Sequence, residues 1–203
     1  GSIAGEGRIQ FADWTSTGQL GSITLTGGAI ADTSGNSGGT IQVRGDRVEL
    51  TERSQLLANT FGNGNGSGIS IEARQFNVQQ GAFLSASTFG TGNAGGVRLS
   101  ADSIDLQGTN PGQTLFQLFS GTLETTNLTG GIYAVSLGTG AAGKISIVTD
   151  RLQMGTAANL LTTTLQAGAG GDLSIQATGR VQLTEGVLVA TATQGDGNAG
   201  NLT

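Results

Sequence analysis

The chain has 203 residues, 37 of them glycine and only 11% charged, with 9 Lys and Arg against 14 Asp and Glu and a formal net charge of −5. This balance argues against nucleic acid as a partner. The absence of cysteine and histidine excludes disulfides, thiolate nucleophiles, the serine–histidine triad and the usual zinc ligands. No apolar run approaches the roughly 18 residues of a membrane-spanning helix, so the chain is not expected to span a membrane.

Residues 1–36 are predicted to form one or more diverged coils of a unit that becomes regular further along. Short alternations of apolar and polar residues indicate strands here, because side chains two residues apart face the same side of a strand. These alternations are Ile9/Phe11, Ile23/Leu25 and Ala31/Thr33.

Residues 37–203 contain an internal repeat of about 28 residues. The first apolar residue after each glycine-rich turn recurs at spacings of 28, 28, 48, 28 and 29, at Ile41, Ile69, Val97, Ile145, Leu173 and Leu202. A second apolar set follows at Val48/Leu50, Phe76/Val78, Ile104/Leu106, Leu152/Met154 and Val181/Leu183. A third set precedes the next turn at Leu56/Ala58, Leu84/Ala86, Ile132/Ala134, Leu160/Thr162 and Val189/Thr191. Three sets in one register predict three short strands per coil.

Such short strands cannot bury an apolar face alone, but stacked coils merge their inner residues into one core. The repeat therefore predicts an all-β fold, a parallel β-solenoid with three sheets along its axis and coils roughly 4.8 Å apart. Right-handedness is the default for this class. The chain stops at "GNAGNLT", just as another unit begins, so we expect a piece of a longer protein.

An inserted loop is predicted at about residues 107–131, where the spacing lengthens to 48. It contains the only proline and an apolar cluster. Insertions in solenoids lie on one face, which often binds a partner; alternatively, this segment covers an exposed strand edge. The candidate contact residues are Pro111, Leu115, Phe116, Leu118 and Phe119.

The glycines of the repeated turns are expected at corners where each coil turns sharply, often with positive φ, and passes close to its neighbours. These turns resemble phosphate-binding loops only superficially. The stretch "GTGAAGKIS" at 138–146 includes Lys144, but it leads into a strand, whereas a P-loop leads into a helix. Asp172 and Asp196 lie near turns without the periodic acids of a calcium-binding repeat. We therefore expect no cofactor and no metal.

Enzyme chemistry is not expected, because the acids are scattered. Catalysis on polysaccharides needs clustered carboxylates, yet only Glu49 and Asp105, with Gln153, share one predicted column. Two further columns are interpreted as structural. Thr60, Thr88, Thr164 and Thr193 form a threonine ladder, not an ice-binding array, and Asp46, Arg74, Asp102 and Asp150 occupy one corner of successive coils.

The repeated pattern of "GNAGG", alternating apolar residues and "LxAxTxGxGNAG" resembles the β-helical shafts of filamentous haemagglutinin-like exoproteins of Gram-negative bacteria, including photosynthetic ones. The resemblance covers about residues 20–203. It implies export by two-partner secretion and no catalytic residues to transfer.

The expected function is a secreted or surface-exposed structural or adhesive segment, located extracellularly or on the outer cell surface. Its partners would be a host or neighbouring cell surface, a polysaccharide or another copy of itself. Two alternatives remain open: a carbohydrate-binding or carbohydrate-active β-helix, and a self-assembling filament or sheath subunit.

Overall fold

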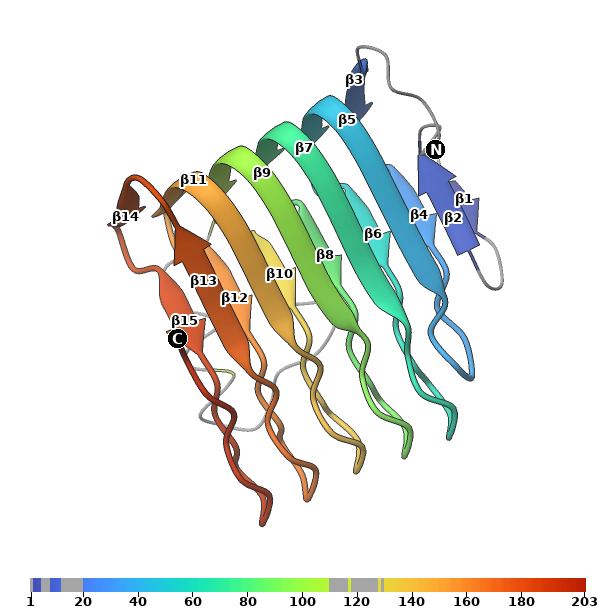
Figure 1. The fold of residues 1–203 in the computed structure, drawn as a ribbon. Helices are drawn as coiled ribbons and strands as arrows, with labels where there is room; N and C mark the ends of the chain where they lie inside the picture. Colours follow the sequence, from blue (N-terminus) through green and yellow to red (C-terminus); the bar gives the residue numbers. More distant parts are fainter. Residues whose placement is uncertain (1, 5–7, 12–19, 110–116, 118–127, 129) are drawn as a thin grey trace.

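The computed structural model describes residues 2–4, 8–11, 20–109, 117, 128 and 130–203. Every regular element in this part of the chain is a β-strand, and the strands stack as the turns of a solenoid (Figure 1). The strands are β1 (Ser2–Ala4), β2 (Arg8–Phe11), β3 (Ser22–Leu25), β4 (Ile30–Asp32), β5 (Thr40–Leu50), β6 (Gln55–Leu57), β7 (Gly68–Val78), β8 (Phe83–Ser85), β9 (Gly96–Gln107), β10 (Gly131–Tyr133), β11 (Ile145–Gly155), β12 (Asn159–Leu161), β13 (Leu173–Ala177), β14 (Val181–Leu183) and β15 (Leu188–Ala190).

Two parallel sheets run along the axis. The short strands form one sheet, in the order β1-β4-β6-β8-β10-β12-β15. The other contains β5, β7, β9 and β11, flanked by β2 and β3 at one end and by β13 and β14 at the other. Ile41 pairs with Ile69, which pairs with Val97, 28 residues further along each time. The predicted all-β parallel β-solenoid is therefore confirmed, and it has about six turns.

The arrangement of the sheets differs from the prediction in one respect. In the central coils the first two apolar segments form one continuous strand of 11 or 12 residues, which bends at a corner. In β5 the buried positions change phase at this bend, because Asp46 and Arg47 both face outward between buried Gly45 and Val48. Two outward residues in succession let one strand serve two walls, so there are two hydrogen-bonded sheets where three were expected.

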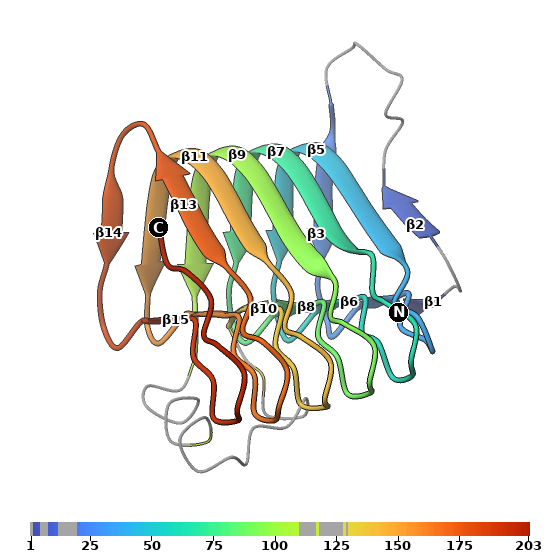
Figure 2. The same ribbon diagram turned by 60° about the horizontal axis from the view of Figure 1, so that its bottom comes forward.

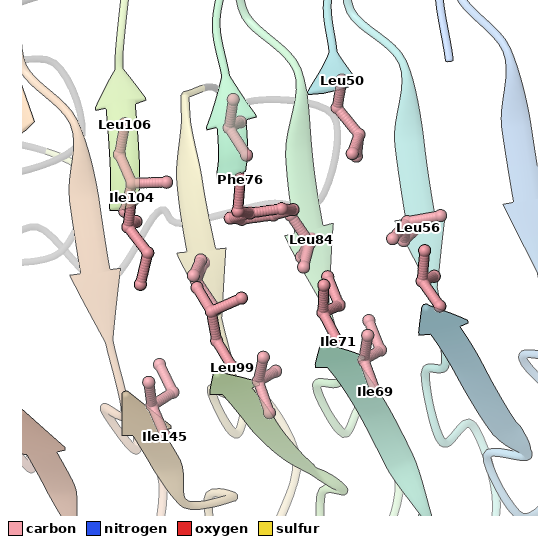
Figure 3. Close-up of a cluster of buried hydrophobic side chains, with 14 of the residues drawn as sticks. Leu50, Leu56, Ile69, Ile71, Phe76, Leu84, Leu99, Ile104, Leu106 and Ile145 are labelled. Carbon is pink, nitrogen blue, oxygen red and sulfur yellow. The ribbon is translucent and has the colours of Figure 1, made fainter. Parts of the chain in front are cut away.

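The core is a set of apolar columns that run through the central coils, part of which Figure 3 shows. Each column consists of residues paired in register, such as Val48, Phe76 and Ile104, all at most 1% exposed. Ala58, Ala86 and Ala134 are fully buried where the short strands leave the sheet. Inward side chains from both sheets meet in this core, which stabilises stacked coils that could not be stable singly.

Except between β9 and β10, where the inserted segment lies, a tight turn joins each strand of the long-strand sheet from β3 onward to the following short strand. Its two central residues both have positive φ, as in a type I′ turn, and the amide that closes the turn bonds back three residues. Ser54 N donates to Thr51 O at 3.0 Å and Ala82 N to Gln79 O at 3.1 Å. The central pairs are Gly27–Gly28, Glu52–Arg53, Gln80–Gly81, Thr156–Ala157 and Glu185–Gly186.

Replacing Arg53 by glycine is expected to stabilise the chain by roughly 0.5–1 kcal/mol, because Arg53 has φ of +61° and a side chain in this region is strained. The urea midpoint should rise. The matched control is Gly81→Ala at the equivalent position one coil on, where φ is +78° and an added Cβ meets nothing closer than 3.4 Å. The control should lose about as much stability; equal midpoints in both variants would contradict the role of φ.

Candidate functional site

The glycine-rich loops project side by side from one end of the long strands (Figures 1 and 2). Their glycines are required by close contact between coils. A Cβ on Gly92 would lie 1.9 Å from Gly64 O, and one on Gly140 would lie 2.0 Å from Gly92 O. Positive φ was also expected at these corners, but among the glycines of these loops and the next strand's start only Gly68 has it. Contact between neighbouring backbones, not turn geometry, therefore selects glycine.

The backbone amides of these loops bind the neighbouring coil. Gly92 N donates to Gly62 O at 2.9 Å and Ala94 N donates to Ala141 O at 2.9 Å. Asparagine side chains extend this ladder, since Asn93 Oδ1 accepts from Ala141 N at 3.0 Å. A phosphate-binding loop needs several convergent unpaired amides, and these amides are already engaged between coils.

The threonine column is interior in the central coils, and Thr193 in the last coil is partly buried. Thr60, Thr88 and Thr164 are fully buried and are joined through bridges that include Ser136. Their hydroxyls hold the loops closed: Thr88 Oγ1 donates to Gly92 O at 2.7 Å. The structural interpretation of this ladder agrees with the structure, because a surface for ice would need these side chains in solvent.

The corner ladder lies where the long strands bend. Arg74 holds Asp46 by two parallel hydrogen bonds, from Nε at 2.7 Å and from Nη2 at 2.9 Å. Together with Glu72 and Asp102, these residues line an open hollow of about 700 Å³. Glu72 also forms an ion pair, with Arg44 at 3.5 Å. The hydrogen bond from Arg74 lowers the pKa of Asp46, which is the opposite of what a general acid needs.

Substituting Arg74 by glutamine is expected to raise the pKa of Asp46 toward the ordinary aspartate value. In the folded chain this pKa is lowered, so the pair stabilises the fold above the unfolded-state pKa and loses its effect as pH falls through the folded-state pKa. An NMR titration of the Asp46 carboxyl measures the change. Arg53→Gln, which removes the same charge elsewhere, should leave the titration unmoved; a shift in this control alone would contradict the assignment.

The column that contains Glu49 and Asp105 exists in the register expected. Glu49 pairs with Asn77, Asn77 with Asp105, and Asp105 with Gln153. Asn77 separates the two carboxylates by two strand spacings, roughly 10 Å. Glu49 lies 3.4 Å from the guanidinium of Arg47. These two acids are therefore not brought together as a catalytic pair.

The inserted segment lies between β9 and β10. Its predicted contact residues Pro111, Leu115, Phe116, Leu118 and Phe119 lie outside the described residues. Leu128 belongs to a second apolar cluster on the outer side of the short-strand sheet, in which Phe83, Tyr133, Val135 and Leu161 are at most 5% exposed. Leu128 thus packs against the outer face of this sheet, whereas the alternatives expected for the segment were contact with a partner or cover of a strand edge.

A groove on the outer face of the long-strand sheet was not predicted. It has a volume of about 410 Å³ and lies over four central coils. Arg98 and Lys144 border it, with serine and threonine hydroxyls around them. From the sequence, Lys144 was considered only as part of the stretch 138–146, which resembles a P-loop but leads into a strand. One feature of the sequence could have indicated the groove: in the column that begins at Thr40, the next two positions are glycines, Gly68 and Gly96.

The fold defines a class, the parallel β-solenoid repeat proteins. Comparison with protein-family models, curated proteins and solved structures found no match to this chain. Over the described ranges there is no helix long and apolar enough to cross a membrane. The same ranges contain no group of three or more Asp or Glu residues placed to hold a metal ion.

Proposed function

We propose that this chain is a structural or adhesive segment of a secreted or surface-exposed protein, of the filamentous haemagglutinin-like kind. The observation that carries the proposal is the continuity of the hydrogen-bonded tracks along the axis. Adjacent central coils are joined through the long strands, the short strands and the glycine loops. Three tracks of this kind resist bending and extension, as a shaft must.

The outer surface supports the same proposal. Two carboxylates at the corner form ion pairs with arginine, Asp46 with Arg74 and Glu72 with Arg44. Pairs of this kind along a ladder stabilise neighbouring strands. We accordingly propose that the chain is not an enzyme.

Surface location is tested with antibodies raised against residues 20–203 and applied to intact and permeabilised cells that produce the protein. Labelling of intact cells, lost after brief external proteolysis, is the expected result. Labelling only after permeabilisation would contradict an extracellular or outer-surface location.

Adhesion is tested with beads that carry the purified chain. They should adhere to the producing cells or to one another, and beads carrying Gly140→Ala should adhere less, because this substitution disturbs the stacked loops. Adhesion between beads alone would favour the self-assembling alternative. Beads that adhere to nothing would contradict the adhesive role. The structural role would then be tested separately, by measuring the resistance of the chain to pulling in single-molecule force experiments.

A further inference from the structure

We propose that the groove bordered by Arg98 and Lys144 binds an acidic sugar unit, with the two cations holding its carboxylate. The groove is lined by Thr40, Ser67, Ser70, Arg98, Lys144 and Ser146 together with backbone of β7 and β9. This inference does not depend on the proposed shaft function, since a groove can bind a sugar whether or not the chain is surface-exposed.

Two adjacent glycines line the groove. Their column reads Thr40, Gly68, Gly96 and Lys144 in successive coils, and Gly68 is required by backbone contact, since a Cβ there would lie 2.0 Å from Gly96 O. The hollow between Thr40 and Lys144 spans three strand spacings, roughly 14 Å. Its volume of about 410 Å³ falls within the range of small-molecule sites, about 300–1,000 Å³. The space exceeds what a single inorganic anion needs and suits a sugar.

The charge around the groove is opposite to that of the chain as a whole. The chain has a net charge of −5, yet the groove's lining, as far as the structure describes it, contains two cations and no carboxylate. Arg44, Arg47, Arg74 and Arg151 form ion pairs, whereas in the described part of the chain Arg98 and Lys144 form none. Their Cα atoms are separated by one strand spacing and two residues, about 8 Å. A carboxylate between them can accept hydrogen bonds from both.

The hydroxyls identify the rest of the ligand. Ser70, Arg98 and Ser146 are neighbours in one column, so a serine lies beside Arg98 on each neighbouring strand. Hydroxyls both donate and accept, which matches the hydroxyls of a sugar ring. None of the described residues that line the groove is aromatic, so they offer a nucleotide no stacking surface for its base. The lining therefore favours a uronic acid residue over a nucleotide.

Asp172 is the carboxylate that opposes this binding. It follows Lys144 in the same column, and Lys144 contributes, after the hydrogen bonds from Asn201, to lowering the pKa of Asp172. Removing its charge should leave Lys144 more available to a ligand. Asp172→Asn is therefore expected to tighten binding, a direction of change that damage to the fold would not produce.

The test is an NMR titration of the chain with α-1,4-linked trigalacturonate, with neutral maltotriose and with inorganic sulfate as comparison probes. Trigalacturonate should cause saturable shifts at the amides of Gly68, Ser70 and Gly96, and maltotriose should not. Arg98→Gln and Lys144→Gln should each weaken binding about tenfold, because each removes a charge-assisted hydrogen bond. Raising NaCl from about 0.1 to 1 M should also weaken it.

Arg53→Gln is the matched control, since it removes the same charge from an exposed arginine that does not line the groove. It should bind as the unaltered chain does, and circular dichroism confirms that each variant is folded. Equal binding of maltotriose, or equal weakening by Arg53→Gln, would overturn the proposal. Saturable shifts from sulfate without any from trigalacturonate would overturn it too, because the groove would then accept only small inorganic anions.

Discussion

Alanine at Gly140 is expected to destabilise the chain by about 3 kcal/mol or more, seen as a large fall in the urea midpoint. The added Cβ would lie 2.0 Å from the carbonyl oxygen of Gly92 in the preceding coil. This neighbour is backbone, so it cannot move aside as a flexible side chain can. Relief requires the two coils to separate, which lengthens hydrogen bonds such as Gly140 N to Gly90 O, now 3.3 Å.

Gly21→Ala is the matched control, because an added Cβ at Gly21 meets nothing within 4 Å. Its stability should change by no more than about 0.5 kcal/mol, as for most surface substitutions. If Gly140→Ala and Gly21→Ala unfold at the same urea concentration, the glycine loops are not stacked in contact.

Phe76→Ala is expected to cost about 3–5 kcal/mol, the usual range for removing a buried aromatic side chain. Phe76 is fully buried, and its ring extends toward Leu84 of the opposite sheet (Figure 3). Its partners in register are the smaller Val48 and Ile104. These smaller partners leave the cavity largely unfilled, so the loss should be near the upper end. Urea unfolding measures it.

Two further variants separate burial from the loss of an aromatic ring. Phe61→Ala removes a ring that is 57% exposed and packs on Phe89 with centroids 5.5 Å apart, so it should cost only about 1 kcal/mol. Phe76→Leu keeps most of the volume and should cost about 1–2 kcal/mol. A smaller loss for Phe76→Ala than for Phe61→Ala would contradict the position of Phe76 in the core.

Much of the fold could be predicted because a solenoid repeats its contacts. Once Ile41, Ile69 and Val97 share a spacing, they are predicted to pair in register, and the same inference places Asp46 beside Arg74. The carboxylate column of Glu49 and Asp105 was also placed correctly. Pairing between equivalent coils converts a distance along the chain directly into neighbours in space.

The candidate site was predicted less well. The groove at Arg98 and Lys144 is lined by residues of two columns, two of which are glycines. These residues come from several coils, so no single coil contains more than part of the groove. Lys144 was considered only because of the P-loop-like motif, and the fold does not form a phosphate-binding loop there. The glycines were correctly assigned to the corners, but the expected positive φ occurs instead mainly in the turns around Arg53 and Ala157.

The sequence by itself determined the period, the register and the identity of the inward columns, because alternation and repetition are properties of the chain order alone. The tertiary structure decided which side chains meet across columns and which spaces remain open. It joined two predicted strands into one by placing Asp46 and Arg47 outward in succession at the bend. It also brought the loops into backbone contact. These outcomes depend on distances between coils, which the order of residues along one coil does not contain.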